Sequence, residues 1–276
     1  MRGIREMMVD VGRVADQLSW NIRKCTGIGD TVKRVSELKP LKVGTLLKNR
    51  YKVEKLLSWD GRSSRYLTRD IDDYGIYELR EFSEGSGIAV EREIVTKRLH
   101  HGGLVRRYDF FVEDSRSYVV LAYEKNPDLD KARRLLSDRD LLSIASNLAE
   151  TLDFLHRHWM AHVDLSMGNI VDRGETQKIV DLSGCRLFKP PSTEGFREAR
   201  KGDFLQLLDL LERLILRDME ESGDSSLLPF IRGFEELVGI PPVSAEDFRE
   251  GLFQCHIMGV IGQKGEIKCA GTLRIE

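Results

Sequence analysis

The stretch that decides the fold runs from residue 162 to residue 184, where 162–169 reads HVDLSMGN and 178–184 reads KIVDLSG. The first segment carries Asp164 and Asn169 between two hydrophobic elements, and the second carries Asp181. A loop carboxylate can accept a proton, while an amide oxygen and a second carboxylate at adjoining strand ends can hold Mg²⁺ on a nucleotide phosphate. The pattern indicates a phosphotransfer site. The alternative is that Asp164 and Asn169 are ordinary turn residues.

Helical patterns flank this stretch on both sides. Upstream, apolar residues recur at helical spacing over 141–155, and Ser137 with Asp140 resembles a capping box at the start of a helix. Downstream, the segment from Asp203 to about residue 217 is apolar almost all round, which predicts a helix in the centre of a core. The same capping pattern at residues 244–247 predicts a further short helix.

The first half of the chain has a strand-like character. β-Branched and aromatic residues cluster there in five runs, which predict a small sheet. The runs are Tyr51 to Leu57, Arg65 to Thr68, Ile76 to Phe82, Tyr108 to Val112, and Tyr118 to Tyr123. Between the third and fourth runs, Ala89 to Leu99 carries apolar residues at helical spacing, which predicts one helix within this sheet region.

The two segments of the opening stretch resemble the catalytic loop H-R-D-x-x-x-x-N and the metal-binding D-F-G of the protein kinase superfamily. The order of predicted strands and helices also agrees with that family, over roughly Val43 to Arg249. The resemblance implies an α+β fold of two lobes, a small β-rich N-lobe and a larger helical C-lobe. The expected domains are 1–45 for an N-terminal helical extension, 46–124 for the N-lobe, 125–254 for the C-lobe and 255–276 for a strand-like tail.

The resemblance also implies roles for the residues of the opening stretch. Asp164 takes the position of the catalytic base, and Asn169 and Asp181 take the positions of the Mg²⁺ ligands. Asp203 begins the buried helix that anchors the catalytic loop. His162 corresponds to a residue that supports the loop structurally, so it is not expected to bind metal.

Other positions correspond to the ATP-binding part of the family. Arg80 stands where a strand lysine pairs with the phosphates, and Tyr123 and Glu124 fall on the hinge whose backbone would hydrogen-bond adenine. The helix acid that should hold Arg80 is Glu93 if the alignment shifts by one residue. Without that shift the position falls on Arg92, and two cations would face the same cleft and repel unless an anion lay between them.

The chain departs from the family at the loop that covers the phosphates. Active kinases carry three glycines there, so that the backbone can approach the phosphates. The corresponding positions are Ser58, Asp60 and Ser63, and Gly61 lies between them. Asp60 would bring a negative charge toward phosphate unless the loop turns away. Arginine in place of the lysine is not a conservative exchange at a packed site.

Further departures concern regulation and substrate. Val163 replaces the arginine of H-R-D, so a phosphorylated activation loop would find no partner there. Leu182-Ser183 replaces F-G, and no A-P-E lies between Asp181 and Asp203. Two functions follow as hypotheses. The first is a divergent, weakly active ATP- and Mg²⁺-dependent phosphotransferase whose acceptor is an unknown protein or small molecule, with protein Ser/Thr favoured. The second is a pseudokinase that acts as a partner-binding or allosteric scaffold.

The composition and charge of the chain limit the classes of partner that it is expected to bind. The chain has 276 residues, 43 Lys and Arg, 45 Asp and Glu, and a formal net charge of −2, which does not favour bulk binding to nucleic acid or an anionic membrane. No apolar stretch approaches the ~20 residues that span a bilayer. Asp10, Arg13 and Asp16 interrupt any apolar region of a secretory signal, so we expect a cytoplasmic protein. The four cysteines show no paired spacing, so we expect reduced thiols. Residues 4–22 predict an amphipathic helix packed on the kinase-like body, and the tail predicts a hairpin.

Overall fold

The computed structural model describes residues 38–61, 63–82, 87–126, 128–132, 135–174, 176–191, 194–222 and 244–252. By its internal contacts the chain divides into two units, Met1–Ser36 and Glu37–Glu276, and every described residue belongs to the second. The helix predicted at residues 4–22 and the hairpin predicted in the tail lie outside the described residues. The boundary predicted at residue 45 falls inside the second unit.

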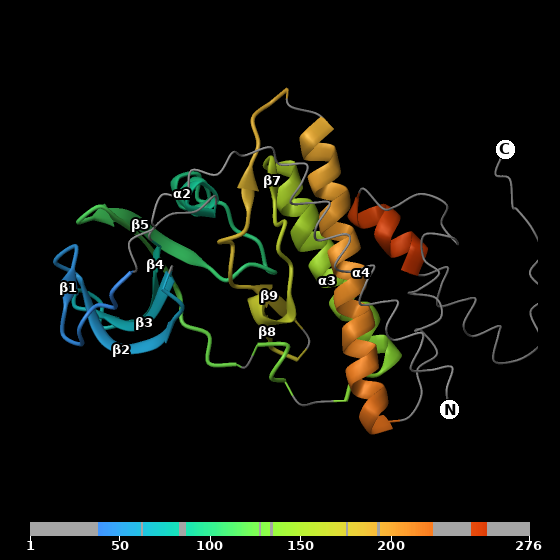
Figure 1. Ribbon diagram of the computed structural model, residues 1–276, viewed down its shortest axis with the longest axis horizontal. Coiled ribbons are helices and arrows are strands. Elements are labelled where there is room, and N and C mark those ends of the chain that lie inside the picture. Colours follow the sequence, from blue (N-terminus) through green and yellow to red (C-terminus); the bar gives the residue numbers. More distant parts are fainter. Residues whose placement is uncertain are drawn as a thin grey trace, which may run out of the picture. The chain divides into compact units, whose positions relative to one another are not determined.

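An antiparallel sheet forms the first part of this unit (Figure 1). Its strand order is β1-β2-β3-β4-β6-β5, and the helix α2 (Gly87–Thr96) lies against β5 and β6. The strands are β1 (Leu46–Leu47), β2 (Tyr51–Trp59), β3 (Ser63–Asp70), β4 (Ile76–Phe82), β5 (Arg107–Glu113) and β6 (Arg116–Ala122). The five predicted strands and the helix between them are confirmed.

Strand β6 is buried on both faces from Tyr118 to Leu121, which explains why it reads as a continuous apolar run. Side chains alternate between the faces, so Val120 and Val119 belong to different clusters. The outer cluster consists of Leu47, Tyr51, Val53, Tyr66, Leu79, Tyr118 and Val120. The inner cluster consists of Phe82, Val105, Val119, Leu121, Val171 and Val180. The inner cluster therefore joins the sheet to the segments that carry the predicted site.

Two long helices pack side by side in the second part of the unit. The helix α3 (Asp138–Arg157) begins with the predicted capping box of Ser137 and Asp140. The helix α4 (Glu194–Ser222) begins nine residues before the predicted start at Asp203. Its extra turns are held by tertiary contact, because Phe196 is buried and stacks on Trp159 at 5.0 Å between ring centroids.

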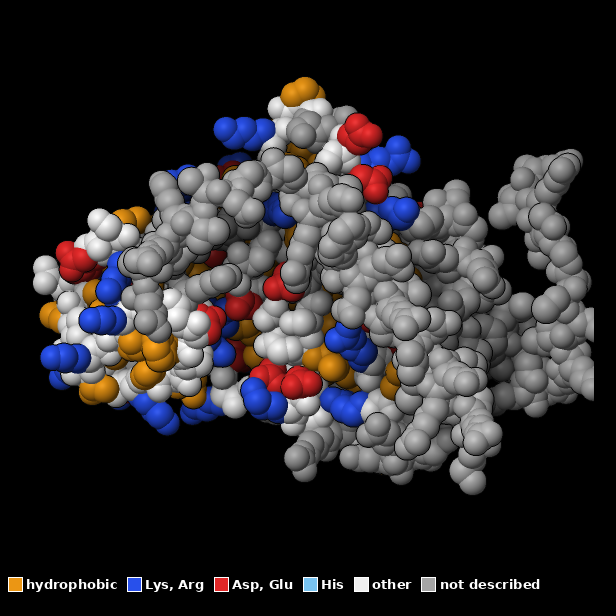
Figure 2. Space-filling view, in the orientation of Figure 1, with side chains coloured by type: hydrophobic (Ala, Val, Ile, Leu, Met, Phe, Trp, Pro, Cys, Tyr) orange, Lys and Arg blue, Asp and Glu red, His pale blue; other side chains and the backbone are white. Residues whose placement is uncertain are grey.

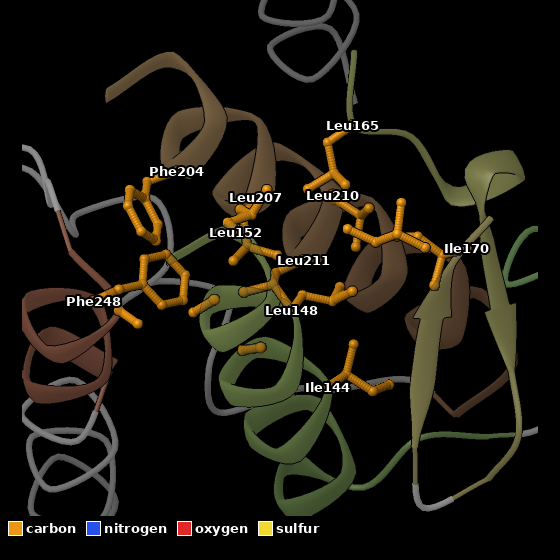
Figure 3. Packing of buried hydrophobic residues seen from close by; sticks show 14 of the residues in the cluster. Ile144, Leu148, Leu152, Leu165, Ile170, Phe204, Leu207, Leu210, Leu211 and Phe248 are labelled. Atoms are coloured by element: carbon orange, nitrogen blue, oxygen red, sulfur yellow. The ribbon is translucent and has the colours of Figure 1, made fainter. Parts of the chain in front are cut away.

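Leucines of the two helices interdigitate in the main core (Figure 3). Leu148 and Leu152 of α3 meet Leu207 and Leu211 of α4, and burying each such side chain contributes roughly 1.5–3 kcal/mol. The helical run at 245–252 adds Phe248, whose ring stacks on Phe204 at 5.7 Å. The short helix predicted from its capping pattern is confirmed. The core therefore fixes the position of α4 against the loop that carries Asp164.

Short antiparallel pairs bracket the two segments of the predicted site. The strand β7 (Met160–Ala161) pairs with β10 (Arg186–Leu187), and β8 (Ile170–Asp172) pairs with β9 (Gln177–Ile179). The first segment runs from the end of β7 to the start of β8, through the short helix η1 (Met167–Asn169). The second runs from the end of β9 to the start of β10. The two loops therefore lie next to each other.

The described surface has mixed charge. On the face drawn in Figure 2, Lys and Arg side chains are interspersed with Asp and Glu side chains. None of the helices in the described ranges is long and apolar enough to cross a bilayer.

Candidate active site

The loop after β7 is held from below by Asp203 of α4. The Asp203 carboxylate is fully buried and accepts hydrogen bonds from the backbone N–H of His162 at 2.8 Å and of Val163 at 2.7 Å. His156 of α3 places Nε2 at 2.7 Å from the same carboxylate. One side chain thereby fixes two successive peptide groups and a neighbouring helix, which matches the anchoring role implied for Asp203.

Val163 has an unusual backbone conformation in this loop. Its φ is 65°, a left-handed value that costs a β-branched residue on the order of 1–3 kcal/mol. Both of its peptide groups are tied down, since its N–H donates to Asp203 and its C=O accepts from Gln206 Nε2 at 2.7 Å. Gln206 Oε1 also accepts the N–H of Leu165 at 2.7 Å. These bonds hold the intervening Asp164 with its side chain exposed.

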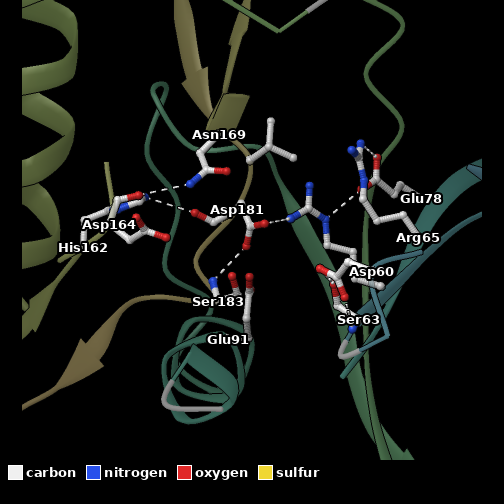
Figure 4. A network of polar contacts seen from close by, with 12 residues as sticks. Asp60, Ser63, Arg65, Glu78, Glu91, His162, Asp164, Asn169, Asp181 and Ser183 are labelled. Carbon is white, nitrogen blue, oxygen red and sulfur yellow. Dashed lines mark hydrogen bonds and ion pairs between the residues drawn. The ribbon is translucent and has the colours of Figure 1, made fainter. Parts of the chain in front are cut away.

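Asp164, Asn169 and Asp181 lie close together (Figure 4). Asn169 Nδ2 donates to the backbone carbonyl of Asp164 at 3.1 Å. The backbone carbonyl of Asn169 accepts the N–H of Val180 at 2.8 Å. A Cβ added to Gly184 would lie only 2.6 Å from the Cβ of Asp164. Glycine at this position therefore allows the segment that carries Asp181 to approach Asp164 closely.

His162 supports this arrangement without access to solvent. Its Nε2 lies 3.0 Å from the carbonyl oxygen of Asp181, to which it donates. Burial lowers the pKa of His162 below the ordinary histidine value, so the ring is neutral near pH 7. These contacts agree with the supporting role implied for this residue.

Arg80 faces Asp181 from strand β4. The Arg80 side chain is 4% exposed, its Nη1 lies 3.2 Å from Asp181 Oδ2, and its Nε donates to Glu78 Oε1 at 2.7 Å. Burial opposes ionisation of Asp181, but the Arg80 charge and the N–H of Ser183 hold the pKa of Asp181 below its ordinary value. Arg80 therefore lies beside Asp181, and its contact with nucleotide phosphates stays a prediction.

A second arginine completes a chain of alternating charges. Arg65 of β3 binds Glu78 through two bonds, Nε to Oε1 at 2.8 Å and Nη2 to Oε2 at 3.0 Å. Burial would raise the pKa of Glu78, but Arg80 and Arg65 hold it below the ordinary glutamate value. The order Arg65, Glu78, Arg80, Asp181 balances two positive charges against two negative ones.

The helix acid is neither of the two alternatives weighed from the sequence. Glu93 pairs at 2.5 Å with Lys97, the residue that follows α2, and Arg92 is exposed, so the structure brings neither to Arg80. The buried acid of α2 is Glu91, which binds Arg107 of β5 through Nε at 2.9 Å and Nη2 at 3.2 Å. Counting back from the following loop, which gave Glu93 or Arg92, misses the helical phase of α2.

The hinge residues follow β6 directly. Tyr123 is partly buried, and the Glu124 carboxylate lies 2.9 Å from Arg173 Nη2 and 3.8 Å from Lys178 Nζ. Because the Glu124 side chain is engaged there, contact between Glu124 and a nucleotide would fall to its backbone groups. The backbone role that the resemblance implies for the hinge stays a prediction.

Asp60, the acidic residue of the turn between β2 and β3, binds groups of the same turn. The Asp60 carboxylate accepts the N–H of Ser63 at 2.7 Å and its hydroxyl at 3.0 Å. The turn is also bound to the preceding chain, since Leu38 N–H donates to the Gly61 carbonyl at 3.0 Å and Trp59 Nε1 donates to the Leu38 carbonyl at 2.7 Å. The Asp60 charge is therefore used inside the turn.

The oxygen donors of Asn169 and Asp181 fit a hard cation such as Mg²⁺. Within the described ranges no group of three or more His, Cys, Asp and Glu side chains could hold a metal by itself. A metal at Asn169 and Asp181 would therefore depend on phosphate oxygens of a nucleotide. A cavity of about 450 Å³ is lined by Ile94, His101, Arg106 and Lys178 among others, and its lining includes none of the predicted site residues.

Sequence reasoning missed two members of this site, Glu78 and Arg65, and the buried pair of Glu91 and Arg107 that ties α2 to β5. Two signals could have found them. Residues two apart on a strand share a face, which places Glu78 beside Arg80. Residues three apart on a helix also share a face, which places Glu91 with the buried Ile94.

Comparisons with known proteins agree with this geometry. The sequence model of the family described as "Protein kinase domain" matches residues 76–202. The probable serine/threonine-protein kinase YbdM of Bacillus subtilis (strain 168) is 24% identical over 184 residues, which cover 63% of this chain and 72% of that protein. The serine/threonine-protein kinase SSN3 of Phaeosphaeria nodorum is 28% identical over 178 residues, which cover 61% of this chain and 40% of that protein.

Among solved structures, the Mycobacterium tuberculosis PknI kinase domain superposes with a TM-score of 0.56 at 17% identity. The match covers 79% of this chain and 100% of that chain. At this identity the likeness shows the fold, and it confirms the predicted α+β kinase-like fold. Together with the sequence matches, it supports membership of the protein kinase superfamily.

Proposed function

We propose that the chain is an ATP- and Mg²⁺-dependent phosphotransferase that acts on a hydroxyl group, with a protein serine or threonine as the favoured acceptor. The observation that carries the proposal is the approach of Asp181, ion-paired to Arg80 at 3.2 Å, to the loop that presents Asp164. A base, two metal-binding oxygens and a cation are what phosphoryl transfer requires. The serine/threonine kinase names of the relatives support the choice of acceptor.

In the proposed reaction the acceptor oxygen forms a bond to the γ-phosphorus, the bond to the bridging oxygen breaks and ADP leaves. Asp164 orients the acceptor hydroxyl and takes up its proton, which its exposure permits. Asn169 and Asp181 would hold Mg²⁺, which neutralises charge on the phosphates when bound. Arg80 would contact phosphate oxygens, and the backbone at Tyr123 and Glu124 would bind adenine.

We expect turnover to be slow. Arg80 is already held by two carboxylates, so a phosphate must share or displace one of them. The turn at Ser58, Asp60 and Ser63 lacks the glycines that allow close approach of the backbone. Both features reduce electrostatic stabilisation where charge develops, which is a large part of catalysis in this class of reaction.

The test is transfer from radiolabelled ATP to casein, with Asp164→Asn beside the unsubstituted chain. Asp130→Asn, an exposed aspartate outside the site, is the matched control. We expect transfer with the unsubstituted chain and with Asp130→Asn, and its loss with Asp164→Asn. Labelling that survives Asp164→Asn would contradict the role of Asp164.

Binding is tested separately by melting temperature with Mg²⁺ alone, ATP alone and both together. Selective binding to the folded state stabilises it by roughly 2.7 kcal/mol at a ligand concentration of 100 times Kd. We expect a rise only with both, because within the described ranges the metal-binding oxygens do not form a self-sufficient site. A melting temperature unchanged by Mg²⁺ and ATP at millimolar concentration would rule out nucleotide binding of useful strength.

The second candidate function is a pseudokinase that acts as a partner-binding or allosteric scaffold. The bidentate bond between Arg65 and Glu78 favours it, because this pair occupies the cleft face of the sheet beside Arg80. An unchanged melting temperature together with no transfer would support this candidate. Under either candidate we place the protein in the cytoplasm, because the spacing of its four cysteines suits reduced thiols and Cys185 is buried and unpaired.

A further inference from the structure

The carboxylate that holds Arg80 comes from the same strand. Glu78 lies two residues before Arg80 on β4, so both side chains point to the cleft face. Glu78 is 2% exposed, and its Oε1 lies 2.7 Å from Arg80 Nε. This contact needs no movement of another element, because the geometry of one strand fixes both ends.

The buried acid of α2 is committed elsewhere. Glu91 binds two nitrogens of Arg107, and the Arg107 guanidinium also donates to the carbonyls of Val105 at 2.5 Å and Val180 at 2.9 Å. Glu91 thereby ties α2 to β5 and to the residue before Asp181. It influences Arg80 only as a distant charge.

We infer that Glu78 is the positioning residue of Arg80 and that it sets how readily Asp181 accepts a metal ion. This inference rests on the proposed function, because it concerns the Mg²⁺ and ATP bound at that site. Arg80 divides its charge between Glu78 and Asp181. Any charge that Glu78 neutralises is charge that does not oppose a cation at Asp181.

The bonds to Glu78 and Asp181 engage Nε and Nη1 of Arg80 among the described contacts. The remaining donors of the guanidinium fork can then serve a phosphate oxygen. Glu78 thus orients the fork and leaves part of it for the nucleotide. Without the Glu78 charge, the full positive charge of Arg80 would act on Asp181 and would oppose the binding of Mg²⁺ there.

The test measures the Mg²⁺ concentration that gives half of the maximal melting shift at a fixed, saturating ATP concentration. We expect Glu78→Gln to raise this midpoint about fivefold, the factor that corresponds to one modest charge pair. Glu91→Gln should leave the midpoint unchanged, although it lowers the melting temperature itself. Glu54→Gln is the matched control, because Glu54 also pairs with an arginine of the sheet, Arg69 at 2.5 Å.

Glu78→Asp keeps the charge but shortens the side chain, and it should give an intermediate midpoint. It takes the place of Glu78→Gln if that variant does not fold. An unchanged midpoint in the Glu78 variants, or an equal rise in Glu91→Gln, would overturn the inference while the proposed function stands. If the unsubstituted chain shows no melting shift with Mg²⁺ and ATP, both the proposed function and this inference fail.

Discussion

The buried pair of Glu91 and Arg107 offers a sharp test of what holds α2 to the rest of the protein. The Glu91 side chain is 0% exposed and that of Arg107 is 1% exposed, so neither charge has access to water. Replacing Arg107 by Met keeps much of the stem volume but leaves the Glu91 carboxylate without its ion pair. It also removes the donors that bind the carbonyls of Val105 and Val180.

Breaking a buried pair by removing one partner costs about 3–5 kcal/mol, because the other charge stays buried and uncompensated. We therefore expect Arg107→Met to lower the free energy of unfolding by about 4 kcal/mol and Glu91→Leu by about 3 kcal/mol. In the double variant no buried charge remains, and only the two carbonyls lose a donor. We expect it to cost about 2 kcal/mol, which is less than either single variant.

The assay is urea denaturation at pH 7, followed by tryptophan fluorescence, with all variants fitted to a common slope. The control is a more exposed pair at the end of α2, Glu93 and Lys97, 2.5 Å apart, with Lys97 62% and Glu93 28% exposed. Glu93→Gln with Lys97→Met should change stability by no more than about 1 kcal/mol. If the losses from Glu91→Leu and Arg107→Met add within about 0.5 kcal/mol, the reasoning about uncompensated charge is refuted.

Three further outcomes follow from contacts described above. Asp203→Asn should speed amide hydrogen exchange at His162, because an amide offers one acceptor oxygen where the carboxylate offers two, and unchanged exchange would contradict the anchoring role. Gly103→Ala should lower the melting temperature strongly, since the added Cβ would lie 1.8 Å from Thr151 Oγ1. Gly102→Ala is the control and should not lower it, because a Cβ there would have nothing within 4 Å. Similar melting temperatures for the two variants would count against this packing. The pKa of His162 is lowered in the folded chain and ordinary in the unfolded chain, so the unfolded chain binds protons more readily. The free energy of unfolding should therefore fall as the pH drops below about 6.5, by at most about 1.4 kcal/mol per pH unit. Urea midpoints between pH 5 and 7 should show this loss, and it should be smaller in His162→Gln.

Most of the fold could be predicted because its elements are long and strongly patterned. Strand β4 has the predicted bounds, Ile76–Phe82, since its apolar and charged residues mark the whole element. Two-residue strands such as β1 carry no period that a pattern could reveal. The first turns of α4 were missed because Phe196 is the buried apolar residue there, and its partners are distant in sequence.

The site could be predicted less completely than the fold. Motif spacing located Asp164, Asn169 and Asp181 in neighbouring loops, and their catalytic and metal-binding roles remain predictions. The helix acid was misplaced because loop lengths were counted, whereas burial depends on helical phase, which selects Glu91. The bond between Glu78 and Arg65 joins two strands, and their pairing register is not visible in a single sequence.

The bonds between Leu38 and the turn of β2 and β3 also have a kinetic consequence. For this turn to lift away from the strands beneath it, the N–H of Leu38 must leave Gly61 and its carbonyl must leave Trp59. Lifting of the turn and release of the chain before β1 are then a single opening event. Under conditions where every opening leads to exchange, the exchange rate of the Leu38 amide hydrogen equals the rate of that event, and this rate limits how fast a ligand enters beneath the turn.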